Sequence, residues 1–150
     1  MKTKMTLLVF ALLLATAAFG ESPKCNVRSA MGAYGYSCSG AYQGQPFAAY
    51  GYVFSDGKGQ WHGYGKVSLN GTILPWTHDT RPNDPATVNS DCTGSVTYAV
   101  TIAGQPAPDA HFEYVIVDDG REVKGFPVDS GYAVSCQLIL EKMSKDHVER

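Results

Sequence analysis

Apolar and polar residues alternate with a period of two along most of the chain, the spacing of side chains on a half-buried β-strand. The clearest case begins with Tyr50, Tyr52 and Phe54, which share one face of a predicted strand. A turn follows at 56–59, Asp-Gly-Lys-Gly, whose glycines can adopt positive φ. The alternation resumes at 61–69, so this stretch predicts two strands joined by a tight turn.

The same period recurs downstream and upstream of this pair. The other predicted strands are 34–38, the stretch from Thr72 to Leu74, a short strand at 87–88, 95–102, 111–117, 122–126 and 132–140. Asn70-Gly71 is the strongest hairpin signal, and Asp118-Asp119-Gly120 marks another turn. Residues 104–108 are predicted as a proline-rich connection.

These strands have no helices to cover a parallel sheet, so the sheet must be antiparallel. Short strands joined in sequence by hairpins favour an up-and-down meander, and closing the meander removes its exposed edges. We therefore expect an all-β domain, a single antiparallel up-and-down β-barrel of about eight strands. A barrel of that size has an interior that side chains fill or that holds one small ligand.

The segment 75–85 interrupts the alternation. Pro75, Pro82 and Pro85 cannot donate ladder hydrogen bonds. Together with Trp76 they predict a long loop at the rim of the barrel, bordering a pocket mouth and dispensable for folding.

The N-terminus reads as a secretory signal peptide over residues 1–20. Lys2 and Lys4 precede an apolar run from Leu7 to Phe19, too short to span a bilayer, and a small-residue cleavage site precedes Glu21. The remaining 21–150 would form the barrel domain with a short charged C-terminal tail. We expect a secreted or periplasmic protein.

Composition narrows the range of partners. The formal net charge is −2 and no basic stripe is present, so nucleic acid is not an expected partner. The chain also lacks a cationic amphipathic segment, so no membrane association is expected after signal cleavage.

Four cysteines in an exported chain suggest two disulfides, for which three connectivities exist. Closing the barrel brings the first and last strands together, which favours Cys38–Cys136. Cys25 and Cys92 lie next to turns and form the second predicted pair. None of the spacings is a Cys-x-x-Cys pair, so a zinc site is not expected.

Several motifs in order resemble a group of exported bacterial proteins of unassigned function. They are Cys25 with Gly32-Ala33-Tyr34-Gly35-Tyr36, the 54–59 turn, Ser68-Leu69-Asn70-Gly71, 89–95, and the closing hairpin from His111 to Glu122. The resemblance covers most of the chain after the signal peptide. It implies a small calycin-like barrel, similar to the allene oxide cyclase barrel, without that enzyme's catalytic motif.

Aromatic residues are the main candidates for a ligand site. Tyrosines recur on strand faces predicted to point inward, where rings supply apolar contact and hydroxyls fix orientation. The candidate ligand-binding residues are Tyr36, Tyr52, Tyr98, Tyr132 and Trp76. A packed structural core explains the same tyrosines equally well.

Few residues suggest catalysis or metal binding. His111 and Glu113 share one strand face, but a solvated outer face explains them better than a metal site or an acid–base pair. His62 is expected to be exposed. We predict no catalytic residue, no metal site and no cofactor.

The sequence therefore favours a secreted, non-catalytic protein that binds an apolar small molecule inside the barrel. An isomerase or cyclase built on the same barrel is one alternative. A protein-interaction module with a filled core is another, and the oligomeric state is left open.

Overall fold

The computed structural model describes residues 24–140. The predicted signal peptide, its cleavage site and the charged tail lie outside the described residues. Within them the chain forms nine strands and two short 3-10 turns. These are η1 (Val27–Ala30), β1 (Gly32–Tyr42), β2 (Gln45–Ser55), β3 (Trp61–Leu69), β4 (Thr72–Thr80), β5 (Thr87–Val88), β6 (Thr93–Ile102), β7 (Gln105–Val117), η2 (Asp118–Gly120), β8 (Glu122–Pro127) and β9 (Tyr132–Leu140).

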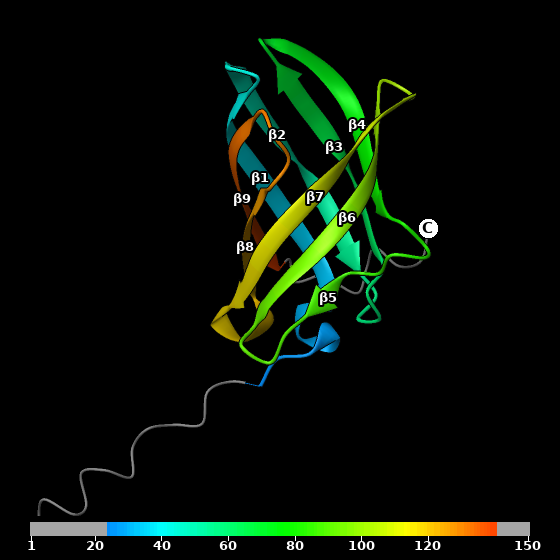
Figure 1. The fold of residues 1–150 in the computed structure, drawn as a ribbon, viewed down its shortest axis with the longest axis vertical. Coiled ribbons are helices and arrows are strands. Elements are labelled where there is room, and N and C mark those ends of the chain that lie inside the picture. The colour runs from blue at the N-terminus through cyan, green and yellow to red at the C-terminus, as the bar shows by residue number, and fades with distance from the viewer. Residues whose placement is uncertain (1–23, 141–150) are drawn as a thin grey trace, which may run out of the picture.

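All strand pairings are antiparallel, and the sheet order is β4-β3-β2-β1-β9-β8-β7-β6-β5. A further pairing between β4 and β6 closes eight strands into a barrel, with β5 as a short addition outside the ring (Figure 1). Both the predicted fold class and the short strand at 87–88 are confirmed. The Asn70-Gly71 turn is confirmed too, with φ of 49° and 82° at its two residues, as a tight hairpin requires.

The predicted rim loop at 75–85 was wrong in its first half. Strand β4 runs to Thr80, and from Trp76 onward it pairs with β3 on one side and β6 on the other. Pro75 is tolerated because it precedes the part of β4 that pairs with β6. Since these residues close the barrel, deleting 77–84 would open it, contrary to the sequence prediction that they are dispensable.

The inner face of β1 carries Tyr34, Tyr36 and Cys38, all buried. The register places Val53 and Gly51 of β2 opposite the two tyrosines, so these residues also face inward. The residues that alternate with them along β2, including Tyr50 and Tyr52, therefore point outward. The prediction that Tyr50 and Tyr52 face the interior was wrong, because Gly51 occupies the inward position that Tyr36 needs left empty.

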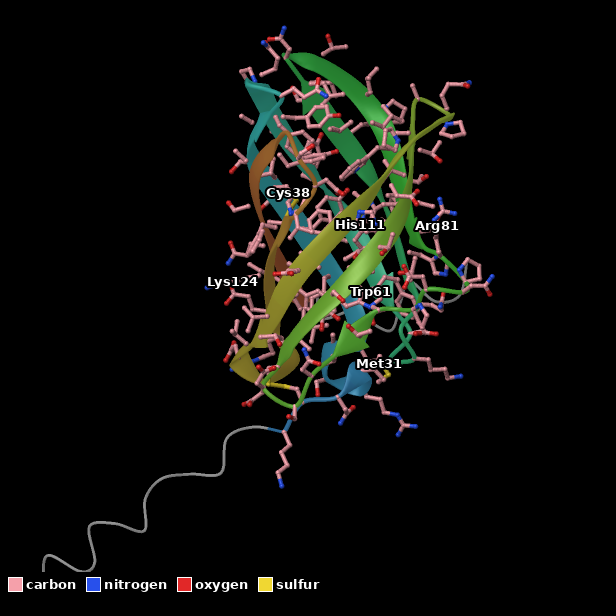
Figure 2. All side chains as sticks on the ribbon, in the orientation of Figure 1. Met31, Cys38, Trp61, Arg81, His111 and Lys124 are labelled. Carbon is pink, nitrogen blue, oxygen red and sulfur yellow. A yellow bond between two sulfur atoms is a disulfide. The ribbon has the colours of Figure 1, made fainter. Side chains whose placement is uncertain are left out.

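The lower end of the barrel in Figure 1 carries η1, η2 and β5, and it is closed by packed aromatic residues. Figure 2 shows Trp61 in this lower half and Cys38 above it. Trp61 stacks on Tyr34, with ring centroids 6.4 Å apart. The Tyr34 hydroxyl donates to the Gly120 carbonyl, and the Tyr114 hydroxyl to that of Thr87, both at 2.8 Å.

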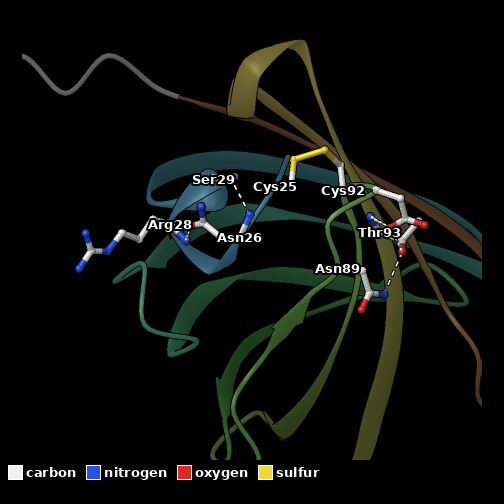
Figure 3. The surroundings of a disulfide bond; sticks show 8 residues. Cys25, Asn26, Arg28, Ser29, Asn89, Cys92 and Thr93 are labelled. Carbon is white, nitrogen blue, oxygen red and sulfur yellow. Dashed lines mark hydrogen bonds between the residues drawn. A yellow bond between two sulfur atoms is a disulfide. The ribbon is translucent and has the colours of Figure 1, made fainter. Parts of the chain in front are cut away.

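Both predicted disulfides are present. Cys38–Cys136 joins directly paired residues of β1 and β9, the first and last strands of the barrel. Cys25–Cys92 ties the segment before η1 to the turn that leads into β6 (Figure 3). Because β5 and η1 lie beside this second bridge, it holds the N-terminal segment against the lower end of the barrel.

Strand β7 begins at Gln105, so the predicted connection at 104–108 was wrong over most of its length. Its residues Phe112–Val117 pair with β8, which ends at Pro127. In the described chain, residues 105–110 of β7 therefore pair only with β6, and their other edge has no strand partner. Pro106 and Pro108 lie in this part, and proline lacks the N–H that would recruit another strand.

Candidate ligand site in the barrel interior

His78 lies on the inner face of β4 and is 7% exposed. The rings of Tyr36, Trp76 and Tyr98 surround it, with centroids 5.2, 5.0 and 5.0 Å from the imidazole. Tyr36 and Tyr98 meet the imidazole edge-on, at 80° and 83°. The histidine therefore lies in an aromatic cage built from β1, β4 and β6.

Glycines on β2 and β3 provide the space for this cage. A Cβ atom on Gly63 would lie 1.9 Å from Nε2 of His78, so the imidazole occupies room that only glycine leaves. Cβ atoms on Gly51 and Gly65 would lie 2.8 and 2.6 Å from the Tyr36 hydroxyl. The glycines of the predicted hairpin thus mark close approach of side chains inside the barrel.

The polar atoms of the cage differ in whether they have a hydrogen-bond partner. The Trp76 indole N–H donates to the Tyr36 hydroxyl, whereas Nδ1 of His78 is buried without a hydrogen-bond partner among the described residues. Burial lowers the pKa of His78 to about 4, although the nearby Asp79 charge acts to raise it. Burial raises the pKa of Tyr36 to about 12. At neutral pH both side chains are therefore uncharged.

A cavity of about 50 Å³ lies beside the cage. It is lined by Tyr36, Cys38, Val53, Trp76, His78, Tyr98, Val100, Ala110, Phe112, Cys136 and Leu138. A second cavity of about 30 Å³ lies between Tyr98 and Trp61. One water needs roughly 10–15 Å³ measured in this way, so the larger cavity has room for only a few waters. Aromatic side chains fill most of the barrel.

The structure brings together three of the five candidate ligand residues. Tyr36, Tyr98 and Trp76 all line the larger cavity. Tyr132 lies outside that lining and packs against Tyr42, with ring centroids 4.5 Å apart. Tyr52 points away from the interior and is 51% exposed.

The other histidines considered from sequence lie on the surface. Nδ1 of His111 is 2.7 Å from a carboxylate oxygen of Asp129, and Nδ1 of His62 is 2.8 Å from one of Asp79. Glu113 is exposed beside His111 on the outer face of β7. Within residues 24–140, no group of three or more His, Cys, Asp or Glu side chains is placed to hold a metal ion.

Sequence reasoning missed His78, although the chain carried a signal for it. Leu74, Trp76, His78 and Thr80 alternate with exposed residues, the period of a strand with one buried face. Pro75 concealed this alternation because a proline argues against a paired strand.

Comparisons of the chain with protein-family models, curated proteins and solved structures find no match. The resemblance to exported bacterial barrel proteins therefore stays a prediction. Over residues 24–140, no helix has the length and apolar character needed to cross a membrane.

Proposed function

We propose that the barrel binds a small, mainly apolar molecule that carries one hydrogen-bond donor. The observation that supports this is Nδ1 of His78, an unpartnered buried atom in an aromatic cage beside a cavity. In the neutral tautomer with its proton on Nε2, Nδ1 is an acceptor. A buried acceptor without a partner costs about 1–3 kcal/mol, which a ligand's donor would recover. The surrounding rings offer the apolar contact area that small-molecule sites use.

The cavity limits the size of this ligand. Typical sites for drug-sized molecules measure roughly 300–1,000 Å³, whereas this cavity measures about 50 Å³. The ligand must therefore be small and extend toward solvent. Ala110 and Phe112 line the cavity next to the unpaired edge of β7, which marks the side from which we expect a ligand to enter.

The protonation state of His78 favours binding over proton transfer. A general acid or base works best when its pKa lies near the operating pH, and burial holds that of His78 at about 4. The neutral imidazole suits a fixed hydrogen-bond acceptor. The isomerase or cyclase alternative therefore has less support.

The two disulfides support the proposal that the protein is exported. Structural disulfides form and persist in oxidising compartments such as the periplasm or the extracellular space. Both bridges join segments far apart in the sequence, with separations of 67 and 98 residues. A secreted or periplasmic location, following cleavage of a signal peptide over residues 1–20, agrees with this arrangement.

Phenol and toluene test the proposal, because they have similar size and only phenol carries a donor. Isothermal titration calorimetry should show saturable phenol binding at one site per chain. We expect affinity for phenol to exceed that for toluene by roughly ten-fold, since only phenol satisfies Nδ1 of His78. His78→Phe keeps the ring and should abolish this preference, whereas His111→Phe on the outer face should preserve it.

Two results would reject the proposal. One is that neither phenol nor toluene shows saturable binding in the calorimeter up to its solubility limit. The other is equal binding of phenol to the original protein and the His78→Phe variant, which would place the compound elsewhere. Unfolding curves of both variants establish that each is folded before titration.

A further inference from the structure

Four aromatic side chains form a cluster on the outer face of β2 and β3, which we call the outer aromatic strip. They are Tyr50, Tyr52, Phe54 and Tyr64, with exposed fractions of 63%, 51%, 50% and 63%. Tyr52 and Tyr64 lie opposite each other in the ladder, with ring centroids 6.1 Å apart. Grouped exposed aromatic rings mark a binding surface more often than isolated ones do.

Small residues on β1 flank the strip. Ala33, Gly35 and Ser37 lie opposite Phe54, Tyr52 and Tyr50 in the ladder, and directly paired residues point to the same face of the sheet. These three side chains are small. They leave the neighbouring aromatic rings accessible from the β1 side, and Ser37 adds a hydroxyl at the same level.

The other side of the strip carries an oriented polar group. His62 lies opposite Phe54, and Asp79 fixes its imidazole through Nδ1 at 2.8 Å. Nε2 is then the ring nitrogen that a ligand can reach. Lys66, opposite Tyr50, is the one cation directly beside the strip on β3, and the Asp79 carboxylate is already engaged.

We propose that the outer aromatic strip binds a neutral oligosaccharide. The C–H faces of sugar rings stack on aromatic rings, and sugar hydroxyls bond to groups such as Nε2 of His62, the Ser37 hydroxyl and the tyrosine hydroxyls. Among the residues opposite Tyr50, Tyr52 and Phe54 in the two ladders, only Lys66 carries a permanent charge, which suits a neutral polyhydroxylated partner better than a highly charged polymer.

The geometry of the strip also indicates the form of this partner. Residues Tyr50 to Phe54 span about 13 Å at a strand rise of roughly 3.3 Å per residue, enough for a few sugar units. Tyr52 and Tyr64 are inclined by 40° to each other. Because these two rings are not coplanar, the strip fits a soluble chain that can adapt to them rather than the flat face of a crystalline polysaccharide.

Calorimetric titration with four soluble neutral probes tests this site: cellohexaose, xylohexaose, mannohexaose and maltohexaose. We expect at least one to bind with a Kd of about 1 mM or tighter, the range of a small exposed contact. Tyr52→Ala should weaken that affinity at least ten-fold, and Tyr52→Phe, which keeps the ring, should weaken it less. The control variant Phe126→Ala removes an aromatic side chain that is also 50% exposed but lies on β8. This variant should bind the oligosaccharide with unchanged affinity.

Failure of all four probes to bind at 10 mM would overturn the proposal. So would a dimer, seen by size-exclusion chromatography with light scattering, that Tyr52→Ala dissociates, because the strip would then be an interface between two copies. The test is independent of the interior site, since Tyr52 lies outside the barrel. Phenol binding should be the same in the Tyr52→Ala variant.

Discussion

His78 makes the stability of the barrel depend on pH, because burial lowers its pKa in the folded chain. The unfolded chain binds a proton at His78 near pH 6.5, whereas the folded chain does so only near pH 4. Between these values the unfolded state holds more protons, so the free energy of unfolding falls as pH falls. Above about pH 6.5 both states are neutral at His78 and the effect vanishes.

We expect this single residue to remove about 3 kcal/mol of stability between pH 7 and pH 4. Urea unfolding across this range, compared between the original protein and His78→Phe, isolates the contribution because carboxylates such as Asp129 titrate in both. The difference in unfolding free energy should change by about 3 kcal/mol over the window. A difference independent of pH would mean that His78 is solvated in the folded protein.

At this scale, sequence reasoning located some interior residues and misplaced others. Tyr36 and Tyr98 could be predicted because each lies in a strand whose inward face is apolar throughout. Tyr52 could not, because both faces of β2 carry aromatic or small residues and only the register with β1 assigns them. A one-residue shift in that register would exchange the two faces.

Closure of the barrel depends on strand β4, and a proline substitution in this strand tests that dependence. Thr77 pairs with Tyr64 of β3 on one side and with Thr101 of β6 on the other. Its backbone N–H therefore points into a strand ladder whichever of the two neighbours it faces. Thr77→Pro should destabilise the protein by on the order of 3 kcal/mol or prevent folding.

Thr77→Ala is the matched control for this change, because the Thr77 side chain is exposed and its loss should cost less than about 1 kcal/mol. Thermal unfolding followed by circular dichroism measures both variants. If the proline variant were as stable as the alanine variant, the pairing of β4 with β6 would not contribute to the fold.

Most strands could be predicted from the sequence because their alternation is uninterrupted, as in β3 and β9. The errors at β4 and the start of β7 share one cause, which is proline within a strand. Pro75 precedes the doubly paired part of β4, and Pro106 lies where one edge of β7 is free. Proline is compatible with a strand at such positions, but the sequence does not reveal which edges are free.

For the whole molecule, the Cys38–Cys136 bridge fixes the join between the first and last strands. Replacing both cysteines with alanine should lower the free energy of unfolding by about 2–5 kcal/mol, because the bridge restricts a long loop in the unfolded chain. The ladder between β1 and β9 remains, so the far-ultraviolet circular dichroism spectrum should not change.

Urea unfolding measures this effect, and the Cys25→Ala/Cys92→Ala variant provides the comparison. That pair encloses a shorter separation, 67 residues against 98, so the entropic part of its effect should be slightly smaller. An unchanged unfolding free energy in the Cys38→Ala/Cys136→Ala variant would indicate that the reduced chain is already restrained by other structure.

The same bridge determines how the protein responds to mechanical force. Tension applied to the two ends of the chain passes from Cys38 to Cys136 through the sulfur atoms, so the intervening barrel bears none of the load. A separation of 98 residues corresponds to about 340 Å of extended chain. That length stays hidden while the bridge is intact, and the overlapping Cys25–Cys92 bridge still hides part of it when Cys38–Cys136 alone is reduced. The extensibility of the protein is therefore set by the redox state of both bonds.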